Sequence, residues 1–171
     1  MVRLIMRVLV GALFMGHGLQ KLKGWFGGYG IEGTGQFFES IGLRPGKRHA
    51  TAAGAAETAG GALLALGFLT PVASAALIGT MATAVKTVHL EKGPWVSEGG
   101  WEYNAVIVAA LAALTETGSG PLSLDRALGT ELSGPFWAFA ALAAGLGGAA
   151  ANLTMSEDAP QTVASAPADV R

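Results

Sequence analysis

The sequence contains no cysteine, and this removes several kinds of chemistry at once. Thiol nucleophiles, disulfide exchange, iron–sulfur clusters and cysteine-ligated zinc all need the sulfur atom of this residue. Any redox function of the chain therefore depends on a bound cofactor or on a partner protein. The absence of cysteine indicates nothing about the cellular compartment.

Charged residues are scarce as well. They make up 13% of the 171 residues, whereas a typical soluble domain has about 25%. Hydrophobic residues reach 51%, and the formal net charge of −1 offers no basic field for nucleic acid. The few charges form clusters that are separated by long uncharged segments. This composition predicts an integral membrane protein of one domain and argues against a soluble enzyme.

The uncharged segments predict a polytopic bundle of membrane helices, an all-α fold. A bilayer core about 30 Å thick needs about 20 apolar residues of helix. Four segments approach this requirement, at residues 4–22, 50–68, 71–90 and 101–115, and an alanine- and glycine-rich fifth covers residues 135–151. Pro71 divides one long uncharged run, because proline cannot continue a helix but starts one well. Small residues such as Gly54 and Gly61 are typical of helices that pack closely in lipid.

The segments between these helices carry weaker signals. Arg3 and Arg7 precede an apolar stretch as in a signal peptide, but no small-residue cleavage site follows, so we expect a retained first helix. Residues 23–49 are polar and rich in glycine. Within them, hydrophobic residues at helical spacing in 35–43 predict a short amphipathic segment at the membrane surface. A solvated loop with one helical turn is the alternative.

Ionisable residues inside the predicted helices are the candidates for function, because a charge at the bilayer centre costs about 2.5–3.5 kcal/mol. Glu57 lies about two turns into the second helix with no basic residue near it in sequence. It is therefore protonated or meets a partner from another helix. On the first helix, His17, Gln20 and Lys21 share one face. Lys21 is interpreted as marking the interfacial end of that helix, since its side chain can extend to water.

A second group of polar residues lies where the third predicted helix ends and the fourth begins. Lys86 and His89 are three positions apart on one face, and Glu102 and Asn104 follow in the next helix. Because successive helices alternate in direction, both groups fall on the same membrane side and predict one shared polar layer. Catalytic roles are predicted for His17, Glu57, His89 and Glu102, and cofactor-binding roles for Gln20, Lys86 and Asn104. No metal site is predicted, because neither an H-x-x-x-H nor an E-x-x-H pair occurs.

Basic residues predict the orientation of the chain in the membrane. One side is flanked by Lys21, Lys23, Arg44, Lys47, Arg48 and Lys92, and the other by Arg3, Arg7 and Arg126. The excess places the 23–49 loop in the cytoplasm and the N-terminus outside. With five spans the tail is cytoplasmic, and with four it is outside.

Four sequence pieces together resemble the DoxX family of bacterial membrane proteins. They are GALFMGHGLQKL (11–22), ETAGGALLALGFLTP (57–71), the region of His89 followed by GPW, and GGWEYN (99–104). The resemblance covers about residues 7–115 and implies a multi-pass protein of the bacterial plasma membrane. We expect a four-helix core in 1–118, a loop and fifth helix in 119–152, and a disordered polar tail in 153–171.

The resemblance implies a redox function in general terms only. The family is named for its similarity to a membrane subunit of archaeal thiosulfate:quinone oxidoreductase, some relatives are thought to join membrane oxidoreductase complexes, and most members have no established activity. In the first hypothesis the polar layer binds a quinone headgroup and relays protons through Glu57 and His17 or His89, since histidine titrates near neutral pH. In the second, the protein is a non-catalytic scaffold that recruits a soluble redox partner through the 23–49 loop. The third is a small transporter, although no internal repeat is detectable.

Overall fold

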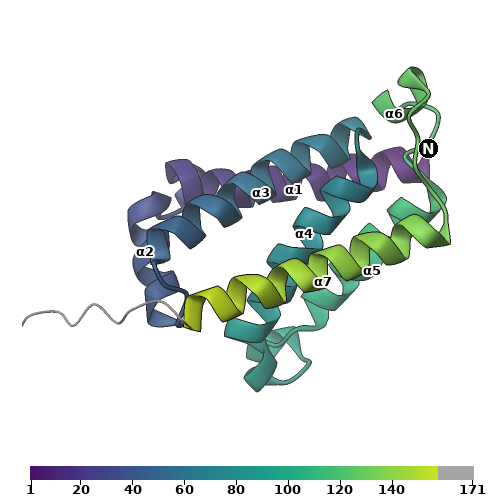
Figure 1. Cartoon of the computed structure of the whole chain (residues 1–171). Coiled ribbons are helices and arrows are strands. Elements are labelled where there is room, and N and C mark those ends of the chain that lie inside the picture. Colours follow the sequence, from purple (N-terminus) through teal and green to yellow (C-terminus); the bar gives the residue numbers. More distant parts are fainter. Residues whose placement is uncertain (158–171) are drawn as a thin grey trace, which may run out of the picture.

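The computed structural model describes residues 1–157, and over this range the protein is a bundle of α-helices without a β-strand. Long helices run between the two ends of the bundle, and a short helix lies at each end (Figure 1). The long helices are α1 (Val2–Lys23), α3 (Gly46–Leu66), α4 (Thr70–Ala84), α5 (Glu102–Thr117) and α7 (Pro135–Glu157). The short ones are α2 (Gly30–Ser40) and α6 (Leu124–Leu128). The predicted all-α membrane bundle, including its fifth helix, is confirmed.

Within residues 1–157, three helical segments are long and apolar enough to cross a bilayer: Val2–Lys23, Thr70–Lys92 and Pro135–Ser156. The alanine- and glycine-rich fifth helix is therefore one of the strongest candidates for a span. By contrast, α5 has 16 residues and is about 24 Å long at 1.5 Å per residue. The α7 helix runs on to Glu157, past the predicted boundary at residue 151, and the rest of the predicted tail lies outside the described residues. Whether residues 1–118 form a core by themselves stays a prediction.

The chain direction alternates between two ends of the bundle. The α2 end holds the last turn of α1, α2 and the first turn of α3, and the α6 end holds the N-terminus, the α3–α4 turn and α6 (Figure 1). The α2 helix occupies the place where an amphipathic segment was expected. In the view of Figure 1, α4 crosses obliquely between α3 and α7.

Glycine residues hold the antiparallel pair α1 and α3 in close contact. A Cβ atom on Gly11 would collide with the carbonyl oxygen of Gly61, and one on Gly18 would lie 2.6 Å from the carbonyl oxygen of Gly54. Two matched points of contact, seven residues apart on each helix, therefore require residues without a side chain. The predicted role of Gly54 and Gly61 in close packing is confirmed, and van der Waals contact between the two backbones stabilises the pair.

The remaining helices form a second group, in which α7 packs along α4 and α5. A Cβ atom on Gly145 of α7 would lie 2.8 Å from the carbonyl oxygen of Ala75, so these two helices also approach closely. The hydrophobic core connects both groups and includes Phe14, Leu64, Leu77, Ile78, Leu111, Leu114 and Ala141.

Two buried charges organise the α3–α4 turn at the α6 end. Arg7, expected among the basic residues that flank the membrane, is only 2% exposed and donates hydrogen bonds to the carbonyl oxygens of Ala65 and Leu122. Asp125 accepts hydrogen bonds from the backbone N–H groups of Leu69 (2.9 Å) and Thr70 (3.2 Å). A cation thus lies at the C-terminus of α3 and an anion at the N-terminus of α4, as the helix dipoles favour.

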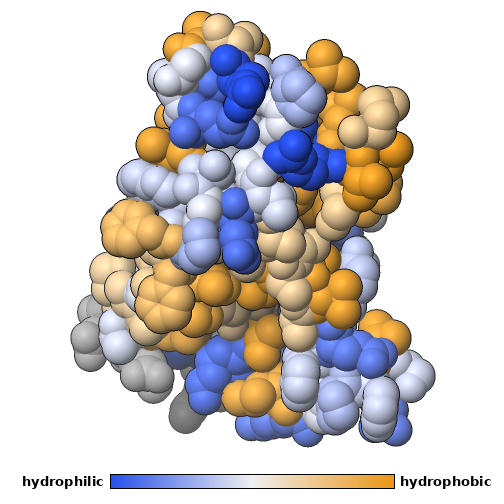
Figure 2. Space-filling view, turned by 90° about the vertical axis from the view of Figure 1, so that its right-hand side faces the viewer, coloured by the Kyte–Doolittle hydropathy of each residue, from blue (hydrophilic) through white to orange (hydrophobic). Residues whose placement is uncertain are grey.

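The outer surface of the α6 end is mixed in character. Figure 2 looks onto this end and shows hydrophilic residues beside hydrophobic ones. The exposed hydrophobic side chains there include Leu122 and Leu128, next to the exposed Arg126. Such a mixture is typical of the boundary between lipid and water, where apolar and charged groups are both accommodated.

Candidate functional site

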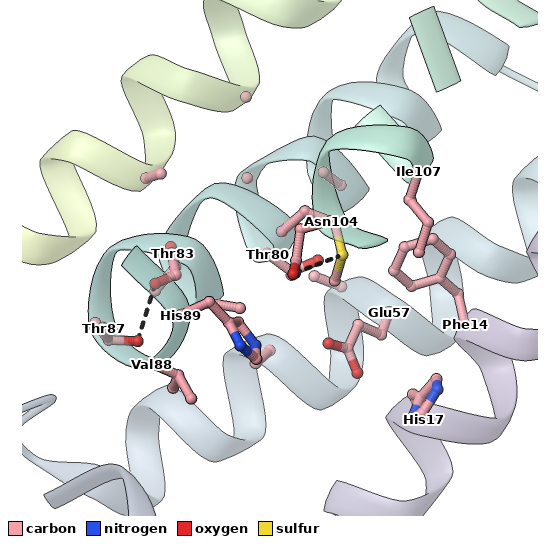
Figure 3. A pocket seen from close by; sticks show the side chains of 18 of the residues that line it. Phe14, His17, Glu57, Thr80, Thr83, Thr87, Val88, His89, Asn104 and Ile107 are labelled. Carbon is pink, nitrogen blue, oxygen red and sulfur yellow. Dashed lines mark hydrogen bonds between the residues drawn. The ribbon is translucent and has the colours of Figure 1, made fainter. Parts of the chain in front are cut away.

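A cavity of about 940 Å³ lies between the α1–α3 pair and the group formed by α4, α5 and α7. Its walls are mainly hydrophobic, and α2 contributes Phe37, Phe38 and Ile41 at one end. Figure 3 shows part of its lining, where side chains of α1, α3, the end of α4 and α5 point toward the same space. The close glycine contacts within each helix group leave this space between the groups open.

An ion pair lies in the wall of the cavity. Lys21 Nζ is 2.6 Å from Glu57 Oε2, and these two are the charged residues among the described residues that line the cavity. Glu57 is 4% exposed, whereas the Lys21 side chain is 23% exposed. Glu57 was expected to be neutral or to pair with a residue of another helix. Its partner is Lys21 of α1. The interpretation of Lys21 as a marker of the interface is wrong, because its ammonium group turns into the protein.

Helix packing explains why Lys21 reaches Glu57. Lys21 follows Gly18 by one turn, and Gly18 lies against the backbone of α3. Side chains on a helix lean toward its N-terminus, and Lys21 Nζ also approaches the carbonyl oxygen of His17 at 3.4 Å. The long side chain therefore runs back along α1 to the depth of Glu57.

His17 lines the cavity beside this ion pair. Gln20 lies outside the cavity and contacts the His17 ring. The Nδ1 atom of His17 is 3.1 Å from Oε1 of Gln20, and Gln20 Nε2 donates to the carbonyl oxygen of Phe26 at 3.2 Å. Gln20 is not among the lining residues. Its position supports the orientation of His17 and the loop after α1, and places it away from any ligand in the cavity.

His89 faces the same cavity from the end of α4 (Figure 3). Its Nδ1 atom lies 2.6 Å from the carbonyl oxygen of Gly99. A carbonyl group only accepts hydrogen bonds, so Nδ1 carries the proton and a neutral His89 presents a lone pair on Nε2. The short loop that supplies Gly99 therefore sets the tautomer of His89.

Lys86 does not share the position of His89. The chain forms a π-helical segment over Val85–His89, and its wider turn changes the relative direction of residues three positions apart. The Lys86 side chain is exposed and does not line the cavity, whereas His89 does. The prediction that Lys86 and His89 lie on one face depends on regular α-helical geometry, and this geometry ends at Ala84.

The two polar residues at the start of α5, Glu102 and Asn104, also differ in whether they line the cavity. Asn104 is buried, lines the cavity, and its Nδ2 atom donates to the sulfur of Met81 at 3.5 Å. Glu102 accepts a hydrogen bond from the backbone N–H of Val96 at 2.8 Å and does not line the cavity. Glu102 thus holds the loop between α4 and α5. The cavity brings together His17, Glu57, His89 and Asn104, and leaves out Gln20, Lys86 and Glu102.

His49 is a further cavity residue that the sequence did not single out. Its Nδ1 atom is 3.0 Å from Asn152 Oδ1, and its Nε2 atom is 3.0 Å from the hydroxyl of Ser156 and 3.1 Å from the carbonyl oxygen of Arg44. It thereby joins the first turns of α3 to the last turns of α7. In the sequence His49 follows a basic cluster and looks interfacial, and no spacing relates it to a residue about a hundred positions later.

Over residues 1–157 no group of three histidine, cysteine, aspartate or glutamate side chains is placed to hold a metal ion. The arrangement instead combines a large apolar space with a compact set of proton-bearing groups. Such a site can hold an apolar molecule and present hydrogen-bond donors and acceptors to its polar end.

Comparisons with known proteins place the chain among its relatives. The family model described as DoxX matches residues 2–90, which run from the start of α1 to just after the π-helical segment. A protein of Bacillus subtilis (strain 168) named "Putative oxidoreductase CatD" is 36% identical over 122 residues, which cover 71% of this chain and 83% of that protein. No solved structure matches. By both comparisons, the chain belongs to the DoxX family.

Proposed function

We propose that the protein is a membrane subunit of an oxidoreductase complex and that its cavity binds a quinone. The observation that carries the proposal is the cavity, whose mainly hydrophobic walls include the Lys21–Glu57 pair. Its volume of about 940 Å³ lies near the upper end of the range of about 300–1,000 Å³ that is usual for ligand pockets. A quinone has the matching form, an apolar chain attached to a polar ring. The oxidoreductase name of the Bacillus relative supports a redox function.

The polar residues of the cavity suit the headgroup of this ligand. Quinone carbonyl groups accept hydrogen bonds, and Lys21 offers donors near the space. The hydroxyl groups of the reduced form donate, and Nε2 of a neutral His89 is an acceptor. A quinone exchanges protons as well as electrons, so His17 and Glu57 are proposed to carry protons between the ring and the aqueous side of the α2 end.

Electrons must come from outside the chain. The sequence has no cysteine that could carry a redox reaction, so a soluble or membrane-bound partner is proposed as the electron donor. We place the complex in the bacterial plasma membrane, with the 23–49 loop on the cytoplasmic side. The loop is the segment through which a soluble partner would be recruited, so the scaffold hypothesis differs from this proposal only in lacking the quinone.

Isolation of the complex from native membranes, followed by extraction of bound quinone, tests the proposal. Wild-type protein is expected to contain quinone. The Glu57→Gln variant is expected to fold but lose quinone-reducing activity, because an amide keeps hydrogen bonds yet cannot release or take up a proton near neutral pH. Glu102→Gln is the matched control, since it changes a carboxylate outside the cavity. Wild-type protein without quinone at saturating supply, or full activity after Glu57→Gln, would contradict the proposal and favour the scaffold.

A further inference from the structure

The cavity continues into a slot between α3 and α7. Figure 1 shows α3 and α7 on either side of α4. On the α3 side the cavity is lined by Ala52, Ala53 and Ala56, and on the α7 side by Ala144, Gly145, Gly148 and Ala149. These residues are no larger than alanine, so side chains do not fill the gap between the two backbones. The slot, defined by these seven residues, therefore belongs to the cavity.

The slot opens on the side of the bundle. Ala52, Ala144 and Gly148 line the cavity and are also exposed on the surface of the protein. The α7 helix is long and apolar enough to cross a membrane, so this side faces the hydrocarbon of the bilayer. A molecule dissolved in the lipid can thus reach the cavity without passing through water.

The aqueous end of the slot is closed. His49 of α3 is hydrogen-bonded to Asn152 and Ser156 of α7 at 3.0 Å each, and both helices are thereby joined at the α2 end. Phe38 and Ile41 of α2 also line the cavity there. Entry from the bilayer is therefore open, whereas entry from water at this end meets a polar bridge and bulky side chains.

The opposite side of the cavity differs in the size of its lining residues. There α1 contributes Leu9 and Leu13, and α5 contributes Tyr103 and Val106. These are large side chains, and all four are exposed. The extended apolar chain of a ligand fits better in the slot than on this opposite side. The alanine and glycine residues of the slot allow the ligand close contact with the helix backbones.

Charge decides which membrane amphiphile the site suits. The charged residues among the described lining are Lys21 and Glu57, and they neutralise each other at 2.6 Å. A phospholipid would bring an anionic phosphate into a site that has no unpaired cation among these residues, at a high cost of desolvation. A quinone headgroup carries no charge and meets no such cost.

We infer that the slot between α3 and α7 is the entrance from the bilayer and the seat of the isoprenoid chain of the quinone. The inference rests on the proposed function, since the headgroup occupies the cavity at the Lys21–Glu57 pair. It adds the route of entry and the part of the protein that recognises the chain.

Two neighbouring glycines of α7 provide a matched test. A Cβ atom on Gly147 or on Gly148 would meet nothing within 4 Å, so both positions accept a larger residue. Gly148 lines the cavity and Gly147 does not. Gly148→Trp therefore obstructs the slot, and Gly147→Trp makes the same change facing away from it. Ala53→Trp obstructs the slot from α3 and serves if Gly148→Trp fails to fold.

Equilibrium binding to the purified full-length protein is measured with two radiolabelled quinones that share a headgroup, one with a long isoprenoid chain and one with a single isoprene unit. In Gly148→Trp the long-chain quinone is expected to bind about tenfold more weakly, which corresponds to the loss of about two buried methylene groups. The short-chain quinone is expected to change by less than about twofold. Gly147→Trp is expected to bind both quinones like the wild type.

Each other outcome overturns a defined part of the reasoning. Equal weakening of both quinones in Gly148→Trp, or no weakening of either, refutes the slot as the seat of the chain and leaves the proposed function standing. Displacement of the long-chain quinone by phosphatidylglycerol at equal concentration shows a phospholipid site and also refutes the inference. Wild-type protein that binds neither quinone refutes the proposed function, and the inference falls with it.

Discussion

Removal of Lys21 leaves Glu57 without its counter-charge inside the bundle. Lys21→Met keeps the length and apolar stem of the side chain but deletes the ammonium group that lies 2.6 Å from Glu57 Oε2. Glu57 is 4% exposed, so water cannot replace the lost partner. The variant should therefore be strongly destabilised, whereas the double variant Lys21→Met/Glu57→Gln, which has no charge to bury, should recover much of the loss.

The magnitude follows from the two states open to the carboxyl group. Breaking a buried ion pair by removal of one partner costs about 3–5 kcal/mol. Protonation of Glu57 sets an upper limit on this loss of stability. Neutralising a carboxyl of ordinary pKa, about 4.3, costs about 3.7 kcal/mol at pH 7. Partial exposure of Lys21 weakens the original pair, so we expect a loss of about 2–3.5 kcal/mol at pH 7. At pH 5 protonation costs only about 1 kcal/mol, and the loss should shrink accordingly.

Reversible unfolding in mixed detergent micelles, followed by tryptophan fluorescence, measures these differences. Single variants, the double variant and wild type form a double-mutant cycle at pH 7 and at pH 5. Lys23→Met is the control for loss of a positive charge near the same helix end, since Lys23 takes part in no ion pair among the described residues. A loss below about 1 kcal/mol for Lys21→Met, or a double variant no more stable than that single variant, would refute the structural role of the pair.

Three further predictions concern other parts of the molecule. Gly11→Ala should destabilise the protein by about 1–3 kcal/mol because its methyl group meets the backbone of α3, whereas Gly16→Ala, which meets nothing within 4 Å, should not, as measured by the same unfolding assay. Burial favours a higher pKa for Glu131, but hydrogen bonds from Arg126 and the N–H of Gly120 lower its pKa overall. Its stabilising contribution should thus be present above the ordinary carboxyl pKa and lost as pH falls through the lowered value, and Glu131→Gln should flatten this acid-side slope of stability. Impermeant thiol reagents added to intact cells should leave a cysteine introduced in the 23–49 loop unlabelled, and labelling would reverse the orientation.

The linear sequence was sufficient to predict the kind of fold. Long uncharged segments and the scarcity of charge require helices in lipid, and Pro71 placed the turn between α3 and α4 to within a residue or two. The cost of burying a carboxylate was also enough to predict that Glu57 is either neutral or paired with another helix. These conclusions depend on local composition and on the bilayer, so they need no knowledge of which helices touch.

Only the tertiary structure decided which polar residues meet. Lys21 pairs with Glu57 because Gly18 and Gly54 bring α1 and α3 into contact, and nothing in the spacing of either helix specifies that contact. The π-helical segment turns Lys86 away from His89, and a regular helical repeat cannot show this. Periodicity determines the relative directions of residues within one helix, but the rotation of each helix about its axis and the space left between the two helix groups arise from packing across the whole bundle.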